Sequence, residues 1–150
     1  MDKKKLEEFL IKARTKTYAG AAGKVTPAFK ESYQLEYKEG DWLYRDVYNM
    51  GNSIFAGLET VYYKEKSVWS MSYYGNFKKL SEEETDKILR GALIANKETA
   101  RLWHDFGWEK DNYSYTCAGY GDMDELGGTE EITKDGEKVY FFYYAGGFIG

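Results

Sequence analysis

Aromatic and charged side chains alternate along the segment WLYRDVY in a pattern that could build a binding surface. Successive side chains of a β-strand point to opposite faces, so Trp42, Tyr44 and Asp46 would share one face and Arg45 would lie on the other. A tyrosine joins a flat apolar ring to a polar hydroxyl, so a concave face of this kind could stack a planar or sugar-like ligand and hydrogen-bond to its edge. The alternative is that the same rings fill the space between a sheet and its helices.

A carboxylate pair is the second candidate site. Aligning Trp42 to Gly75 with Tyr113 to Gly146 pairs Glu59 with Glu130 at an offset of 71 residues, and it also pairs Tyr44 with Tyr115. We read this as a degenerate duplication, although two aromatic hairpins in a chain rich in Tyr and Gly also match by chance. If the duplication brings the glutamates near a pseudo-twofold axis, they could share a proton or fix a cation. Tyr115, Glu59 and Glu130 therefore join the candidate ligand-binding residues.

The glycine-rich stretch TYAGAAGKV is not a phosphate-binding loop. Such a loop follows a strand and has Ser or Thr after its lysine, whereas here the glycines follow a predicted helix and Lys24 precedes Val25. The glycines Gly20 and Gly23 are better explained as the end of that helix and a turn.

Other reactive residue types do not form a recognisable site. The segment GDMDELGGTEEI resembles a calcium loop, but Leu126 and Thr133 stand where oxygen ligands are needed, so we expect a solvated acidic turn. Cys117 and His104 are each the only one of their kind, without a nucleophile signature or a zinc ligand set. We therefore assign no catalytic residue, no metal ligand and no cofactor.

Two helices and several strands must position these residues. Leu6, Phe9, Leu10 and Ala13 have helical spacing and predict a helix from about Lys3 to Lys16. Ser81 and Glu84 form a capping box that begins a second helix, from about Glu82 to Ala95. Seven segments have the composition of strands: YQLEYKE, WLYRDVY, IFAGLETVYY, SVWSMSYY, NYSYTCA, a stretch near LGGTEEIT, and KVYFFYY.

These elements predict an α+β fold with a mostly antiparallel sheet of about seven strands and two main helices. Residues 96–111 lack a clear period, and we read them as a short helix around Trp103 followed by a loop. The length of 150 residues suits one domain over residues 1–150, with half-repeats of about 1–75 and 76–150 if the duplication holds.

The composition of the chain limits the classes of partner that we expect it to bind. The net charge is -4 and the charges are interspersed, so no broad positive surface is available and we expect no direct nucleic-acid partner. No segment has the pattern of a secretory signal or is apolar enough to span a bilayer, so we expect no membrane partner. A single cysteine permits no internal disulfide, which fits a reducing cytoplasm.

Three motifs carry a family resemblance: LEYKEGDWLYRD, FAGLE and VWSMSYYG. Together with TYAGAAGKV and EEITKDGEKVYFFYYAGGFI they resemble an uncharacterised family of bacterial domains of unknown function, over nearly the whole chain. This family has GGG where the chain has Gly20-Ala21-Ala22-Gly23. Its members occur alone or C-terminal to a helix-turn-helix of the XRE type, which implies a sensing or effector-binding role by analogy.

We carry three functional hypotheses from the sequence. The first is a cytoplasmic small-molecule-binding or regulatory module, because aromatic strands with embedded Arg45, Asp46 and Glu59 suit a pocket with a polar rim. The second is a protein interaction module, since exposed Tyr and Trp also suit a partner surface. An enzyme that uses carboxylate acid–base chemistry ranks third, because no nucleophile or cofactor motif is recognisable.

Overall fold

The fold is one antiparallel sheet of nine strands with two helices packed on the same face. A computed structural model describes residues 1–150, and the strand order in its sheet is β1-β2-β3-β4-β5-β9-β8-β7-β6. Half of the residues are in strands and 19% are in helices, so the protein is mostly β. The prediction of an α+β fold with about seven strands is therefore wrong.

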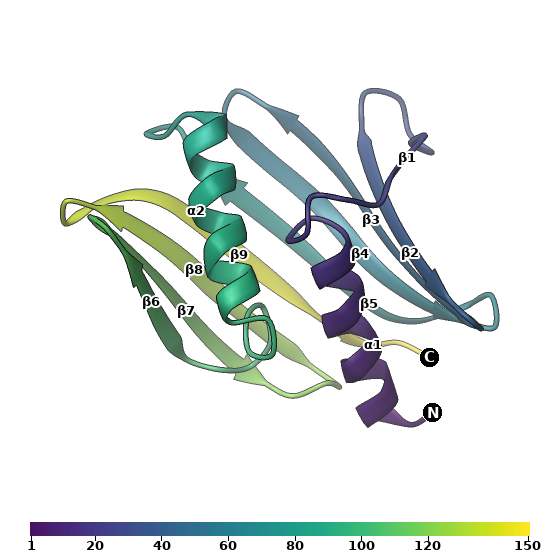
Figure 1. The fold of residues 1–150 in the computed structure, drawn as a ribbon. Coiled ribbons are helices and arrows are strands. Elements are labelled where there is room, and N and C mark those ends of the chain that lie inside the picture. The colour runs from purple at the N-terminus through teal and green to yellow at the C-terminus, as the bar shows by residue number, and fades with distance from the viewer.

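Both helices form where their sequence patterns predicted them. Helix α1 spans Lys3–Lys16, and the side chain of its N-cap Asp2 accepts hydrogen bonds from two backbone N–H groups of the first turn. Helix α2 spans Glu82–Ala95 and is capped by Ser81, whose side chain accepts from the backbone N–H of Glu84. Each helix buries one apolar face, which covers the sheet from the same side (Figure 1).

The strands of the first half are β1 (Lys24–Val25), β2 (Tyr33–Glu39), β3 (Trp42–Gly51), β4 (Ile54–Tyr63) and β5 (Lys66–Asn76). Those of the second half are β6 (Phe106–Lys110), β7 (Tyr113–Gly121), β8 (Leu126–Lys134) and β9 (Glu137–Phe148). The sequence missed β1 and β6, the two edge strands. They contain only 2 and 5 residues, and neither contains a fully buried residue, so their sequence signals are short and weak.

The two halves of the sheet meet at the pairing of β5 with β9, where Tyr73 lies directly opposite Tyr144. These tyrosines are also partners in the 71-residue offset seen in the sequence. The strand register shifts after Val61 in the β4–β5 pair and after Ile132 in the β8–β9 pair, again at positions related by that offset. The half-repeat stays a prediction about the origin of the chain, and these matching places in the sheet support it.

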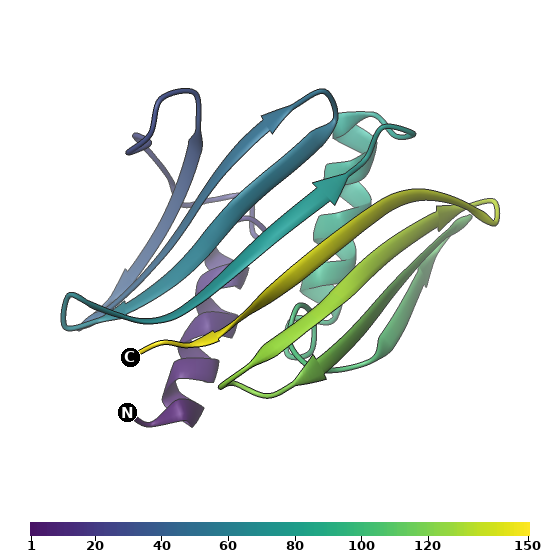
Figure 2. The same ribbon diagram turned by 180° about the vertical axis from the view of Figure 1, so that it is seen from behind.

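The helices bury one sheet face and leave the other uncovered (Figure 2). The core between helices and sheet contains 27 buried hydrophobic residues, with the tyrosines Tyr44, Tyr73, Tyr115, Tyr140 and Tyr144 among them. On the uncovered face, Tyr74, Tyr120 and Tyr143 are among the exposed large side chains. Neither helix has the length and hydrophobicity that a membrane span requires.

Tyr73 and Tyr144, at the junction of the two halves of the sheet, each pack closely over a glycine. A β-carbon added to Gly128 would clash with the backbone carbonyl oxygen of Ala118 and would lie 2.5 Å from the hydroxyl oxygen of Tyr144, and one added to Gly57 would lie 2.5 Å from Cζ of Tyr73. We expect Gly128→Ala to lower the free energy of unfolding by about 1–3 kcal/mol, as for other overpacked cores. Urea unfolding would measure the loss.

Gly51→Ala is the matched control, because a β-carbon at Gly51 would meet no atom within 4 Å and its φ is not positive. We expect that variant to stay within about 0.5 kcal/mol of the natural protein. Equal losses in both variants would show that close packing under Tyr144 is not the reason for the glycine.

Candidate functional site

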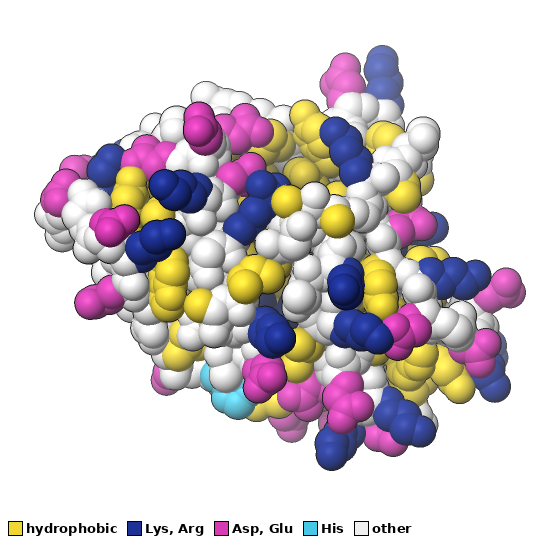
Figure 3. All heavy atoms as spheres, viewed as in Figure 1, with side chains coloured by type: hydrophobic (Ala, Val, Ile, Leu, Met, Phe, Trp, Pro, Cys, Tyr) yellow, Lys and Arg dark blue, Asp and Glu magenta, His cyan; other side chains and the backbone are white.

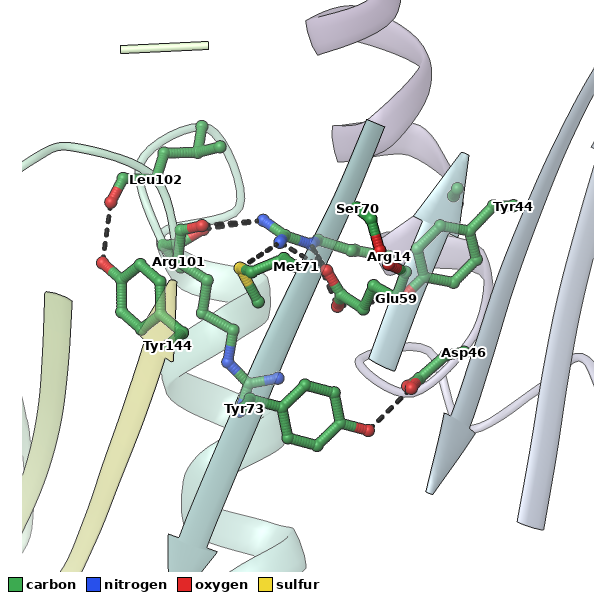
Figure 4. A network of polar contacts seen from close by, with 12 residues as sticks. Arg14, Tyr44, Asp46, Glu59, Ser70, Met71, Tyr73, Arg101, Leu102 and Tyr144 are labelled. Carbon is green, nitrogen blue, oxygen red and sulfur yellow. Dashed lines mark hydrogen bonds and ion pairs between the residues drawn. The ribbon is translucent and has the colours of Figure 1, made fainter. Parts of the chain in front are cut away.

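A buried ion pair joins α1 to the middle of the first half-sheet (Figure 4). Arg14 lies one helical turn after Leu10 and so projects from the buried face of α1 toward β4. Its Nη2 lies 2.6 Å from Oε2 of Glu59, and its Nε donates to both carboxylate oxygens at 3.1 and 3.2 Å. The hydroxyl of Tyr44 donates to the same carboxylate at 2.9 Å. The side chain of Glu59 is only 3% exposed, so this set of donors compensates its loss of water.

The second half-sheet contains an equivalent buried pair. Glu130 is fully buried on β8, where it accepts hydrogen bonds from the hydroxyl of Tyr115 and from Nε of Arg101 at 3.1 Å. Tyr115 and Glu130 are the partners of Tyr44 and Glu59 in the 71-residue offset. The arginines are not related in this way, because Arg14 comes from α1 and Arg101 from the turn after α2. The tyrosine–glutamate pair therefore repeats, while each half recruits its own cation.

The hypothesis that Glu59 and Glu130 form a carboxylate pair is wrong. They lie on β4 and β8, and the strand order places β5 and β9 between them. Three strand spacings separate them by about 14 Å, which is too far for a shared proton. Each carboxylate instead has its own arginine, so neither is available as a partner for the other.

The turn after α2 holds Arg101 in an unusual position. Its backbone has a φ of 57°, in the left-handed region that few residues other than glycine adopt. Two hydrogen bonds fix this turn: Nη1 of Arg14 donates to the carbonyl of Arg101 at 3.0 Å, and the hydroxyl of Tyr144 donates to the carbonyl of Leu102 at 2.7 Å. The turn thus directs the side chain of Arg101 into the core, where its guanidinium lies 4.2 Å from the ring centroid of Phe142.

The guanidinium of Arg101 is only partly satisfied there. Its one protein hydrogen bond runs from Nε to Glu130, and Nη2 is buried without any partner. The residue is 8% exposed, so water cannot readily replace the missing acceptor. A buried donor without a partner costs free energy, which makes Nη2 a candidate contact for a ligand.

Asp46 supplies a carboxyl group to the same region. The hydroxyl of Tyr73 donates to its Oδ1 at 2.6 Å, and no protein donor contacts Oδ2. Burial and, second, the nearby negative charge of Glu59 raise the pKa of Asp46 to about 7. The 71-residue offset places Cys117 at the corresponding site of the second half, where its Sγ lies 3.5 Å from the hydroxyl of Tyr144. Only the first half therefore has a titratable carboxyl beside its central tyrosine.

A cavity of about 290 Å³ opens beside Asp46 and Arg101. The sheet side of its wall includes Tyr48, Phe55 and Tyr73, and the first turns of α2 with Tyr18 form the opposite side. Tyr18 is fixed there because its hydroxyl donates to Asp86 at 2.9 Å and its ring lies 4.7 Å from the guanidinium carbon of Arg90. Figure 3 views this face of the molecule, where hydrophobic side chains show between α2 and the N-terminal strands among basic side chains. The cavity thus joins an aromatic wall to a carboxyl group with one free oxygen and to a guanidinium with a single protein hydrogen bond.

The structure separates the residues that the sequence grouped together. Trp42 stacks on Phe9 of α1 with ring centroids 5.3 Å apart, and Tyr44 and Tyr115 hold the buried glutamates. Arg45 lies on the opposite sheet face, as expected, where its Nε contacts Glu36 at 2.8 Å. Of the predicted binding residues, Asp46 alone lines the larger cavity, while Tyr44, Asp46 and Glu59 line a smaller one beside Arg101.

The sequence analysis missed Arg14 and Arg101, the two cations of the core. Arg14 carried a usable signal, because an arginine one turn after Leu10 and beside Ala13 belongs to the apolar stripe of the helix. The sequence around Arg101 gave no such signal, because the segment 96–111 has no hydrophobic periodicity that would predict a buried side chain. We expected a short helix there, and the structure has turns followed by β6.

Comparison with known proteins identifies a family and no function. The model of a family described as a domain of unknown function (DUF5680) matches residues 46–149, which include Asp46, Glu59, Arg101 and Glu130. Searches of curated proteins and of solved structures gave no match.

The raised pKa of Asp46 predicts how stability depends on pH. The pKa is about 7 in the folded protein and about 4 in an unfolded chain, so between these values the folded state holds a proton that the unfolded state releases. This contribution is complete below about pH 4 and is lost as the pH rises through about 7. We expect the melting temperature of the natural protein to fall more between about pH 5 and pH 8 than that of Asp46→Asn, whose amide oxygen can still accept from Tyr73. Parallel curves for the two proteins would contradict a titrating Asp46.

The burial of the Arg14–Glu59 pair predicts a large cost for breaking it. Arg14→Met leaves Glu59 buried without a cation, and we expect it to lower the free energy of unfolding by about 3–5 kcal/mol. Arg45→Met removes an arginine from a pair whose side chains are 36% and 25% exposed, and we expect at most about 1 kcal/mol. Chemical denaturation of both variants compares them directly, and similar losses would contradict the central role of the buried pair.

Proposed function

The chain belongs to the DUF5680 family of domains of unknown function, and we propose that it is a small-molecule-binding module whose site is the cavity beside Asp46 and Arg101. The observation that carries the proposal is the guanidinium of Arg101, a residue that lines this cavity: it makes one protein hydrogen bond, and its buried Nη2 has no partner. A ligand acceptor would remove the cost of that orphan donor. The cavity is near the lower end of the range of about 300–1,000 Å³ for ligand pockets, which fits a compound of metabolite size.

The backbone of Arg101 supports the same proposal. A residue other than glycine in the left-handed region costs about 1–3 kcal/mol, and such residues cluster at ligand sites. Here the turn is held in place by Arg14 and by Tyr144, one from each half of the chain. The protein thus uses both halves to keep one arginine at the cavity wall.

The same contacts offer a route for regulation. Arg14 binds the carbonyl of Arg101 with one nitrogen and Glu59 with another, so α1 is directly connected to the turn that carries the ligand-facing arginine. A ligand that favours one position of this turn would favour the matching position of α1. We infer that binding in the cavity would be communicated to α1.

Protein interaction is the second candidate function. Tyr74, Tyr120 and Tyr143 are 39%, 61% and 54% exposed on the sheet face that no helix covers. Exposed tyrosines are common in protein interfaces, where the ring is buried and the hydroxyl keeps a polar partner. We rank it second because this face contains no buried group left without a partner.

Catalysis ranks third. A carboxyl group with a pKa of about 7 in a cleft is what a general acid or base requires, and Asp46 has that property. However, Oδ1 of Asp46 is already engaged by Tyr73, and the neighbouring carboxylate of Glu59 is neutralised by Arg14. This arrangement suits the binding of a ligand better than the movement of protons.

Blocking the cavity tests the proposed function. Ala22 is exposed and lines the cavity, so Ala22→Trp would fill the entrance without disturbing the buried ion pairs. In a thermal-shift screen of metabolites, a ligand at about 100 times its Kd stabilises the folded protein by about 2.7 kcal/mol, or about 5–10 °C for a chain of this size. We expect hits on the natural protein that Ala22→Trp abolishes.

Ala28→Trp is the matched control, since Ala28 is exposed in the loop between β1 and β2 and does not line the cavity. It should keep every hit. A screen without hits on the folded natural protein, or hits that survive in Ala22→Trp, would contradict binding in this cavity.

A further inference from the structure

Two incompletely satisfied groups of opposite charge belong to residues that line the same cavity. Oδ2 of Asp46 has no protein donor, and Nη2 of Arg101 has no protein acceptor. Both residues are buried, at 5% and 8% exposure, and both line the larger cavity and the smaller one beside it. A ligand in this cavity therefore has both a carboxyl group and a guanidinium in its wall to contact.

The balance of buried charge limits what such a ligand can be. Arg14 is paired with Glu59 and Arg101 with Glu130, so ionised Asp46 is the fifth buried charge and has no cation of its own. A ligand that carries only an anion would satisfy Arg101 but would add a second unpaired negative charge beside Asp46. A ligand that carries only a cation would neutralise Asp46 but would leave Nη2 of Arg101 without an acceptor. Buried charges and donors left in this state are costly.

We propose, building on the binding function above, that the ligand has no net charge and carries a hydrogen-bond donor and an acceptor close together, the donor directed at Asp46 and the acceptor at Arg101. The remainder of the ligand is apolar or aromatic, because Met50, Phe55 and Phe77 line the cavity beyond these two groups. Two kinds of molecule have this chemistry. One is a zwitterionic amino acid, and the other is a planar heterocycle with adjacent N–H and carbonyl groups.

The proposal fixes the direction of the pH dependence. A donor on the ligand stabilises ionised Asp46, so binding tightens as the pH rises through about 7 and releases a proton. A purely anionic ligand would do the opposite, because it favours protonated Asp46. The other groups that face Asp46 are Glu59 on β4, Tyr73 on β5, Arg14 on α1 and Arg101. The arginines stay charged, and burial followed by the charge of Asp46 holds the pKa of Tyr73 well above its usual value.

The experiment compares three sets of probes by thermal shift and then by calorimetry. The first set is the standard amino acids with uncharged side chains, the second is uracil, thymine, cytosine and nicotinamide, and the third is benzoate and benzylamine as singly charged compounds. We expect hits in the first or second set and none in the third, and the set that responds identifies the source of the chemistry. Affinity for the best probe should rise between about pH 6 and pH 8, with proton release seen as a dependence of the heat on the buffer.

Asp46→Asn tests the role of the carboxylate without changing the size of the side chain. We expect it to weaken the best probe by about tenfold or more, the usual effect of losing a hydrogen bond to a charged group, and to abolish the pH dependence. Asp41→Asn is the matched control, because Asp41 is an exposed residue of the turn that precedes β3. It should leave both the affinity and the pH dependence unchanged.

The outcomes separate this proposal from the binding function on which it rests. If benzoate or benzylamine alone binds, and Ala22→Trp abolishes that binding, the cavity is a ligand site but its ligand class is not the one proposed. Affinity that falls as the pH rises would overturn the proposal in the same way. If no probe and no metabolite binds the natural protein, both the ligand class and the binding function are overturned.

Discussion

The structure depends on the need to neutralise two glutamates that lie inside its core. Glu59 and Glu130 are 2% and 0% exposed, and a buried carboxylate without a cation would cost several kcal/mol. Each is held by a tyrosine from the neighbouring strand and by an arginine from outside the sheet. The arginines therefore decide where α1 and the turn after α2 must sit, and the helical layer is positioned over the sheet by charge as well as by apolar packing.

The same constraint produces the candidate site. Arg101 reaches Glu130 through Nε from a turn whose backbone is in the left-handed region, and this geometry leaves Nη2 without a partner in a residue that lines the cavity. Asp46 lies beside it because β3 is the neighbour of β4, where Glu59 raises the pKa of Asp46 after the effect of burial. A free donor, a free acceptor and an aromatic wall thus arise from one arrangement of buried charge.

The two halves of the sheet differ at the one position that matters for this site. Asp46 in the first half and Cys117 in the second lie beside Tyr73 and Tyr144, which face each other at the centre of the sheet. A carboxyl group can bind a donor and change its charge near neutral pH, whereas burial raises the pKa of the Cys117 thiol and keeps it neutral. If the halves arose by duplication, the first half kept or acquired a polar residue at this position, Asp46. In the second half the position is filled by Cys117, which packs in the core.

The sequence by itself determined the local elements. Helical spacing specified both helices, with the Ser81 capping box at the start of α2, and strand-like composition specified seven strands, because these signals act within a few residues. It also singled out Asp46, Glu59 and Glu130. Only the tertiary structure showed that β1 and β6 form the edges of the sheet and that two strands separate Glu59 from Glu130. It alone also placed Arg14 and Arg101 in the core. These features depend on contacts between residues far apart in the chain, and a carboxylate in a sequence does not reveal which distant cation will neutralise it.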